Sequence, residues 1–225
     1  RKELSLQTGD TWGSIWASLV KYGLSKLSKT AIHHRNWIPN IIMFSGQDNE
    51  RPGLLKLGSD IVGKLGLLSG FEIELHGDDY SHKSIFIKDS QATGDNIIRK
   101  YQSSNLYSGM EEITRIYGIG GMEPNTIFIG WSKNKANQIN FQEFVKNLNR
   151  NNFNSIFLRY NATRAFGKNK TIDIWWSGRG RNLSFAIGLI RHLTSSSTWK
   201  DAKVRLLVIT REASQIERAY KSLQS

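Results

Sequence analysis

The amino-acid sequence predicts an α/β fold with mostly parallel, doubly wound sheets. Short apolar runs typical of buried strands alternate along the chain with stretches that have the periodicity of amphipathic helices. The 225 residues, with seven Trp, are enough for one large domain or two small ones. No run approaches the roughly 20 apolar residues of a membrane helix, and no signal peptide is evident. The chain begins at Arg1 rather than Met, so we expect it to be part of a longer protein.

The expected elements follow from periodicity and from turn residues. In the first half the helices are expected at 12–26, 52–65, 92–103 and 109–117, and the strands at 40–45, 67–76 and 126–131, with a short strand at 106–107. In the second half the helices are expected at 141–148, 182–193 and 212–223, and the strands at 155–160, 171–176 and 203–210. The link from 160 to 171 is short for a crossover, so the strand at 171–176 is a candidate for antiparallel pairing.

Charge divides the chain into two parts. Residues 1–131 hold 14 basic and 14 acidic side chains, whereas residues 132–225 hold 17 basic and 5 acidic ones, which is the whole net charge of +12. With the polar stretch 132–138, this predicts a first lobe at 1–135 and a second, basic lobe at 136–225. The second lobe is short for an α/β lobe, which leaves open that C-terminal residues are missing. Its charge favours an anionic lipid surface or nucleic acid, or is simply a solvated basic surface.

Motifs for catalysis and metal binding are scarce. The chain has no cysteine, and it lacks the nucleophile, zinc-protease and phosphate-loop signatures. Acidic and histidine residues gather at one expected strand end, where a divalent metal site is conceivable but a solvated strand end is the expected interpretation; they are Glu72, Glu74, His76, Asp78, Asp79 and His82. We therefore expect no enzyme activity, no metal and no cofactor. An aromatic–basic RNA-binding motif is also absent, so no nucleic-acid partner is expected.

The glycine-rich run Ile116–Trp131 invites comparison with a dinucleotide-binding loop. That loop would need a third glycine at position 123, which is Glu123, and it would follow a strand rather than a helix. The run is instead predicted to be a tight connection from a helix to a buried strand, with Pro124 stopping the helix.

Ligand sites are predicted where strands end and helices begin. A candidate nucleotide site comprises Ser45, Gly46, Arg51 and Gly121. The loop Ser177–Arg181 could bind an anion, although a plain surface turn is the expected interpretation. Trp175 and Trp176 should point to opposite faces of a strand, so that one could dock a partner, unless both pack in the core.

Several of these segments resemble the C-terminal domain of cation–chloride cotransporters. The run from Gly118 to Trp131 is similar to that family's Gly-Leu-Gly-Gly-Met-Lys-Pro-Asn-Thr pattern, and Ile172–Trp176 is similar to its Ile-Asp-Val-Trp-Trp strand. Asn36–Pro39 resembles its Asn-Trp-Arg-Pro segment. The residues that carry the resemblance are Asn36, Trp37, Pro39, Gly118, Gly120, Gly121, Met122, Pro124, Asn125, Asp173, Trp175 and Trp176.

The resemblance implies a cytosolic regulatory domain of a secondary transporter that carries chloride with potassium or sodium. The implied fold is α/β, similar to universal stress proteins, and the implied assembly is a homodimer at the cytoplasmic side of the cell membrane. The implied partner is the transmembrane domain of the same transporter, and an anionic lipid surface is a further candidate. The compact length suggests a prokaryotic member. A nucleotide-binding protein of the universal-stress type is the alternative.

Overall fold

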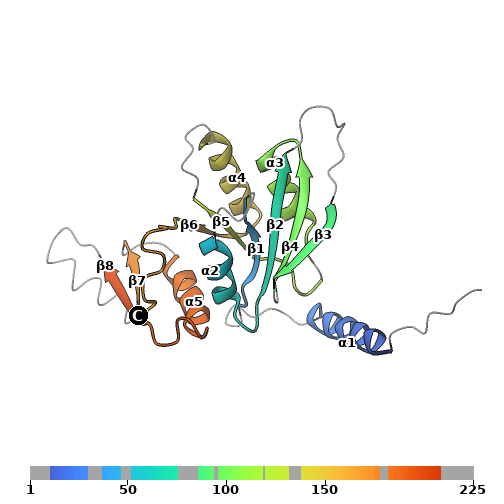
Figure 1. The fold of residues 1–225 in the computed structure, drawn as a ribbon, viewed down its shortest axis with the longest axis horizontal. Coiled ribbons are helices and arrows are strands. Elements are labelled where there is room, and N and C mark those ends of the chain that lie inside the picture. The colour runs from blue at the N-terminus through green and yellow to red at the C-terminus, as the bar shows by residue number, and fades with distance from the viewer. Residues whose placement is uncertain are drawn as a thin grey trace, which may run out of the picture.

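The computed structural model describes residues 11–29, 37–46, 52–75, 86–93, 96–118, 120–131, 138–177 and 182–208. Five helices and eight strands lie within this part of the chain (Figure 1). The helices are α1 (Thr11–Leu27), α2 (Pro52–Val62), α3 (Leu106–Ile116), α4 (Gln138–Arg150) and α5 (Asn182–Thr194). The strands are β1 (Asn40–Phe44), β2 (Leu67–Leu75), β3 (Phe86–Thr93), β4 (Asn96–Ser103), β5 (Thr126–Gly130), β6 (Asn154–Leu158), β7 (Thr171–Trp176) and β8 (Lys203–Val208).

Six strands form the main sheet in the order β3-β4-β2-β1-β5-β6. Neighbours from β4 to β6 pair parallel, and only β3 runs antiparallel, against β4. The chain builds outward from β1 in both directions, first toward β2 and β4 and then toward β5 and β6. The carboxyl ends of β1 and β5 therefore flank the point where the strand order reverses, which is the usual ligand position in such sheets.

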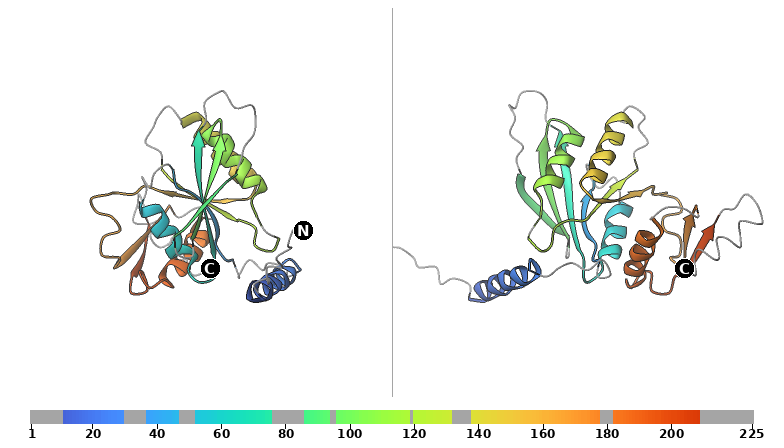
Figure 2. Two further views of the ribbon diagram at one scale, coloured as in Figure 1. Left: turned by 45° about the vertical axis from the view of Figure 1, so that its right-hand side comes forward. Right: turned by 180° about the vertical axis from the view of Figure 1, so that it is seen from behind.

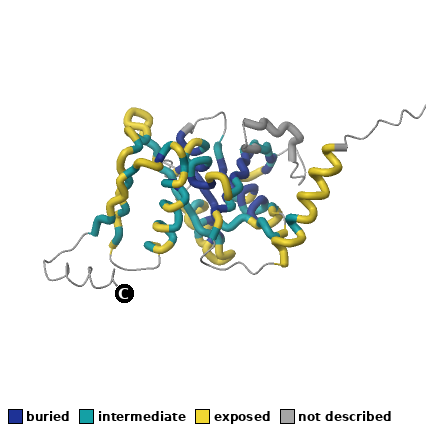
Figure 3. The backbone as a smooth tube through the Cα atoms, turned by 90° about the horizontal axis from the view of Figure 1, so that it is seen from below, coloured by how far each residue is buried: buried dark blue, intermediate teal, exposed yellow. Residues whose placement is uncertain are grey.

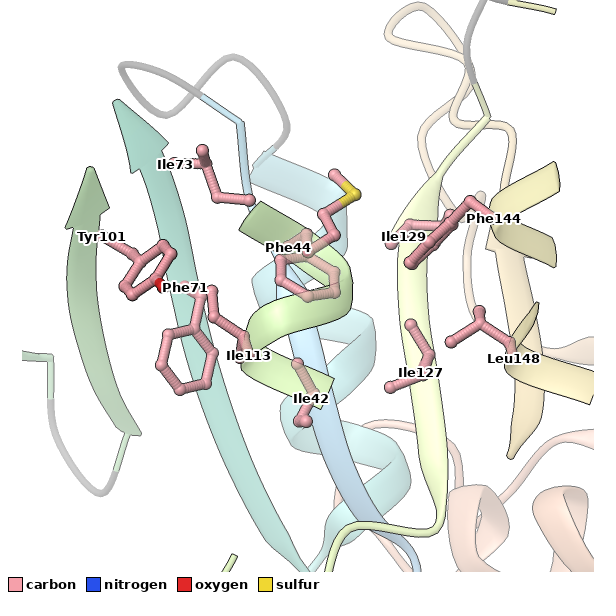
Figure 4. Packing of buried hydrophobic residues seen from close by; sticks show 11 residues of the cluster. Ile42, Phe44, Phe71, Ile73, Tyr101, Ile113, Ile127, Ile129, Phe144 and Leu148 are labelled. Carbon is pink, nitrogen blue, oxygen red and sulfur yellow. The ribbon is translucent and has the colours of Figure 1, made fainter. Parts of the chain in front are cut away.

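Helices cover both faces of this sheet, which makes it doubly wound as expected (Figures 1 and 2). On one face, α3 and α4 pack on side chains of β1, β2, β4 and β5, and Figure 4 shows these side chains gathered between the strands and the two helices. The buried members of this cluster are Ile42, Phe44, Phe71, Ile73, Tyr101, Met110, Ile113, Ile127, Ile129, Phe144 and Leu148.

On the other face, α2 and α5 pack against the sheet and against each other. The buried members of this second cluster are Ile41, Met43, Leu54, Ile61, Val62, Leu68, Phe128, Leu193 and Trp199. Neighbouring strand residues such as Ile127 and Phe128 thus belong to opposite cores, because successive side chains of a strand alternate between its faces. Burial on both faces explains why β1 and β5 are continuous apolar runs.

The helix expected at 92–103 is wrong, since this stretch forms the end of β3 and all of β4. Ile98 and Tyr101 have helical spacing, but pairing with β2 on one side and β3 on the other outweighs that local pattern. The strand expected at 106–107 is also wrong, because α3 begins at Leu106. Asn105 caps this helix with its Oδ1, which accepts hydrogen bonds from the backbone N–H groups of Tyr107 (2.9 Å) and Ser108 (3.2 Å).

Antiparallel pairing of the strand at 171–176 is wrong as well. β7 does not return to the main sheet but pairs parallel with β8 in a second, two-stranded sheet. The connection between these two strands contains α5, and a helical crossover is the connection that parallel strands need. The helix expected at 212–223 lies outside the described residues.

The division between 1–135 and 136–225 stays a prediction. The main sheet takes in α4 and β6 from beyond residue 135, because β6 pairs with β5 along its whole length. The second sheet begins only at Thr171.

Candidate functional site

The glycine-rich turn lies between α3 and β5, at the amino edge of the main sheet. Tyr117 ends α3, and its N–H still donates to the carbonyl of Ile113 at 2.9 Å. Gly121 adopts a φ of +87°, and its N–H donates to both carboxylate oxygens of Glu123, at 3.1 and 3.2 Å. The side chain of Glu123 therefore closes the turn. The turn connects a helix to a strand, as predicted.

Gly121 also allows the end of α1 to approach the turn closely. A Cβ added at this position would lie 2.8 Å from both Leu27 Cβ and the backbone nitrogen of Ser28. Carbon atoms in favourable contact are about 3.5–4.0 Å apart, so a side chain here would collide with α1. Gly121 thus satisfies two demands at once, a positive φ and a close contact with a distant segment.

Asn125 connects three strands at the same edge. Its Nδ2 donates to the carbonyl of Ile38 at 2.7 Å, and its Oδ1 accepts from the N–H of Asn40 at 3.3 Å. Its backbone N–H donates to Asn40, and its carbonyl accepts from the N–H of Asn154. The starts of β1, β5 and β6 are held together in this way, which gives the Pro-Asn-Thr segment a structural role.

Trp37 joins the entry of β1 to the second half of the chain. Its ring packs edge-on against Phe185 and His192 of α5, with centroids 5.5 and 5.6 Å apart. The Nε2 atom of His192 lies 3.1 Å from the carbonyl oxygen of Trp37. Pro39 is buried nearby, and its carbonyl accepts from the N–H of Leu67. Asn36 lies outside the described residues.

The double-tryptophan strand β7 presents one face to solvent. Trp175 is 67% exposed, whereas Trp176 is half-buried, so the two indoles do lie on opposite faces as predicted. On the exposed face, Asp173 pairs with Arg205 of β8 through two hydrogen bonds of 2.7 Å. These hydrogen bonds hold the pKa of Asp173 below its ordinary value and raise that of Arg205. Sequence reasoning missed Arg205, although cross-strand register would have placed it opposite Asp173.

A further contact missed from the sequence ties α2 to the segment after α5. The carboxylate of Asp60 accepts from Thr198 Oγ1 and from Trp199 Nε1, both at 3.0 Å. The contacts of Asp60 and those of Trp37 therefore both join the segment around α5 to the first part of the chain.

The structure does not bring the residues of the candidate nucleotide site together at one edge of the sheet. Ser45 and Gly46 follow β1 at the carboxyl edge, and the N–H of Ser45 donates to the carbonyl of Phe71 at 3.1 Å. Gly121 lies at the opposite, amino edge, and Arg51 lies outside the described residues. An open hollow of about 390 Å³ does occur just past the carboxyl end of β6, lined by Arg159, Tyr160, Asn161 and Ala162.

Among the described residues, no group of three or more His, Asp or Glu side chains is placed to hold a metal ion. Glu74 is instead paired with Lys100 at 2.9 Å. His76, Asp78, Asp79 and His82 lie outside the described residues.

Two curated proteins and one solved structure are similar to this chain. A scan against protein-family models finds no match. Potassium/chloride cotransporter 3 of Caenorhabditis elegans is 24% identical over 234 residues, which take in 92% of this chain and 21% of that protein. Solute carrier family 12 member 2 of Mus musculus is 25% identical over 134 residues, 54% of this chain and 11% of that protein. The chain resembles the cation–chloride cotransporters.

A solved structure with a similar fold is also found. The crystal structure of the cytoplasmic domain of a prokaryotic cation chloride cotransporter matches with a TM-score of 0.58 and 16% identity, over 84% of this chain and 72% of that one. This likeness confirms the predicted α/β fold class and is consistent with the suggested prokaryotic member. The chain spans about a fifth or less of the length of the two curated relatives.

Proposed function

We propose that this chain is a cytosolic regulatory and dimerisation domain of a secondary-active cation–chloride cotransporter. The observation that carries the proposal is the match to potassium/chloride cotransporter 3, which extends over 92% of the chain. On this proposal the domain lies at the cytoplasmic side of the cell membrane, and its partner is the transmembrane domain of the same transporter. Chloride and potassium or sodium are then the ions moved by the whole protein.

The role proposed for the domain is non-catalytic. Regulation of this kind is a coupling free energy between the arrangement of the domain and the open states of the transporter. Coupling needs mechanical connection, and Trp37 supplies one between the entry of β1 and α5. Asp60 supplies a second between α2 and Trp199.

Transport by the full-length protein that contains this chain tests the regulatory role. We expect chloride-dependent cation uptake into proteoliposomes to change when Trp37→Ala loosens the contact with α5. Ile139→Ala is the control, because Ile139 is 77% exposed at the start of α4. Equal uptake by the wild type and the Trp37 variant, with the variant domain folded, would count against regulation through this contact.

Sedimentation of the 225-residue chain tests dimerisation separately. We expect the sedimentation coefficient to rise between about 1 and 100 μM as a dimer forms. A monomer at every concentration would remove the dimerisation role from the domain and leave it to the rest of the transporter.

The alternative, a nucleotide-binding protein of the universal-stress type, is favoured by the hollow beside β6. Arg159 supplies a cation and Tyr160 an aromatic ring for a phosphate and a base. Calorimetric titration with ATP and AMP tests it, with Arg159→Ala expected to weaken binding and Arg164→Ala as the control. No heat and no thermal shift at millimolar nucleotide would rule this function out.

A further inference from the structure

The helix α1 presents large apolar side chains to solvent along most of its length. In the described part of the chain, α1 makes no extensive packing contact with another helix or strand, and it projects away from the sheet (Figures 1 and 2). Figure 3 shows that most of it is exposed. Trp12 is 68% exposed and Trp16 61%, values that are typical of a helix covered by something other than this fold.

The residues of α1 are sorted into two stripes. Apolar side chains recur at helical spacing on one side; they are Trp12, Ile15, Trp16, Leu19, Val20 and Leu27. Lys26 also falls on this side, near the carboxyl-terminal end of the helix. Small polar side chains and one lysine recur on the opposite side; they are Ser14, Ser18, Lys21 and Ser25. The helix is therefore amphipathic, with a wide apolar face.

Charge on α1 has a single sign. The segment from Thr11 to Lys29 contains three lysines and no aspartate or glutamate. Lys26 lies over the ring of Tyr22, 5.6 Å from its centroid. A second copy packed in parallel on the apolar side would bring the two Lys26 side chains together, and α1 has no Asp or Glu to pair with them, which disfavours self-association.

We propose that α1 lies flat in the interface of an anionic lipid bilayer. Tryptophan and tyrosine rings favour the headgroup level of a membrane, and lysine side chains reach from there to anionic phosphates. The 17 residues of α1 extend about 25 Å, less than the hydrocarbon core of about 30 Å. The described helices include none with the length and apolar character that crossing a bilayer requires.

The contact between α1 and the glycine-rich turn determines which end of the helix reaches the lipid. Leu27 and Ser28 lie against Gly121, so the carboxyl-terminal end of the helix is next to the sheet. Trp12 and Trp16 lie at the other end, in the part that projects (Figure 1). This inference goes beyond the proposed function and does not depend on it, because lipid binding is measured without transport.

Flotation of the 225-residue chain with large unilamellar vesicles tests the proposal. We expect the chain to float with vesicles of 30% phosphatidylglycerol in phosphatidylcholine and to bind pure phosphatidylcholine far more weakly, by about fivefold for each lysine near the surface. Trp12→Ala/Trp16→Ala should reduce binding to the anionic vesicles about tenfold or more. Trp175→Ala is the matched control, because Trp175 is 67% exposed on β7, and it should bind like the wild type.

Lysine variants separate α1 from the general basic charge of the chain. Lys21→Gln/Lys26→Gln should weaken binding to anionic vesicles, whereas Lys64→Gln, exposed after α2, should not. Circular dichroism would establish that each variant is folded. Binding that survives the double tryptophan variant, or falls equally with Trp175→Ala, would overturn the proposal. So would a double tryptophan variant that changes only the sedimentation coefficient, since the partner of α1 would then be a second copy.

Discussion

Substitution of Gly121 tests whether the carboxyl-terminal end of α1 lies against the glycine-rich turn. Gly121→Ala introduces a Cβ where φ is +87° and where Leu27 Cβ and the backbone nitrogen of Ser28 are both 2.8 Å away. Two penalties are thus combined: the cost of a left-handed backbone for an L-residue, and a collision with the end of α1. Other glycines of the chain allow these penalties to be measured separately.

The backbone penalty is about 1–2 kcal/mol for a residue forced into the left-handed region. The collision cannot be relieved by rotating a flexible side chain, because one of the two atoms belongs to the backbone of Ser28. However, α1 makes no extensive contact with the other described elements, so the end of the helix can move away at little cost. We therefore expect a loss in the free energy of unfolding of about 1–2 kcal/mol, or a Tm lower by about 2–8 °C.

Urea unfolding of three glycine variants provides the measurement. Gly63→Ala carries the positive φ (+53°) but has no atom within 4 Å of the new Cβ, so it should lose about as much stability as Gly121→Ala. Gly120→Ala has open space and no positive φ, and it should lose the least. Hydrogen exchange of residues 24–29 then reports the collision, because only Gly121→Ala should displace the bond from the Ser28 N–H to the Leu24 carbonyl.

Two results would refute this reasoning. Stability of Gly121→Ala equal to that of Gly120→Ala would mean that the turn does not hold Gly121 in the left-handed region. Unchanged hydrogen exchange at residues 24–29 would mean that α1 does not lie against the turn.

Three further predictions concern the strands. Asn125→Ala should cost about 0.5–1.5 kcal/mol of unfolding free energy, because it removes the side-chain hydrogen bonds to Ile38 and Asn40; unchanged urea unfolding would contradict this. Phe128→Ala, at a fully buried side chain, should cost about 3–5 kcal/mol in the same assay, against a small change for the exposed Trp175→Ala. Because the pKa of Asp173 is lower in the folded protein than its ordinary value of 3.8, its ionised form stabilises the fold at pH values above 3.8. This stabilisation disappears as the pH falls through the lowered pKa of the folded state. Asp173→Asn should therefore lose less stability than the wild type between about pH 5 and pH 2, and parallel pH profiles would contradict the pairing.

Local patterns in the sequence were sufficient for most elements of the main sheet. The strands β1 and β5 are apolar on both faces, so each is recognisable by its own composition. The fold class follows from these strands and from the helices between them. The order of the strands, with β2 on one side of β1 and β5 on the other, is decided by strand pairing. It cannot be derived from the composition of a single strand.

The errors occur where tertiary contacts override local propensity. The spacing of Tyr101 from Ile98 is typical of an amphipathic helix, but both residues lie in the strand β4. Tyr101 is buried there, and its hydroxyl donates to Glu112 of α3 at 2.6 Å. The predicted nucleotide site combines Gly121 with Ser45 and Gly46, which the structure places at opposite edges of the sheet. Only the direction of each strand separates them, since Gly121 precedes β5 whereas Ser45 follows β1.

Most of the residues that carry the resemblance in the sequence lie at the amino edge of the main sheet, although Asp173, Trp175 and Trp176 lie on β7. Gly121 receives the end of α1, Asn125 holds the starts of three strands, and Trp37 contacts α5. The crevice at the reversal of strand order, where an α/β sheet usually binds a ligand, lies at the opposite edge. If these motifs served nucleotide binding, they should line that crevice. Their contacts at the amino edge instead indicate a structural role: Gly121 permits the close approach of α1, Asn125 joins the strand starts, and Trp37 attaches the entry of β1 to α5.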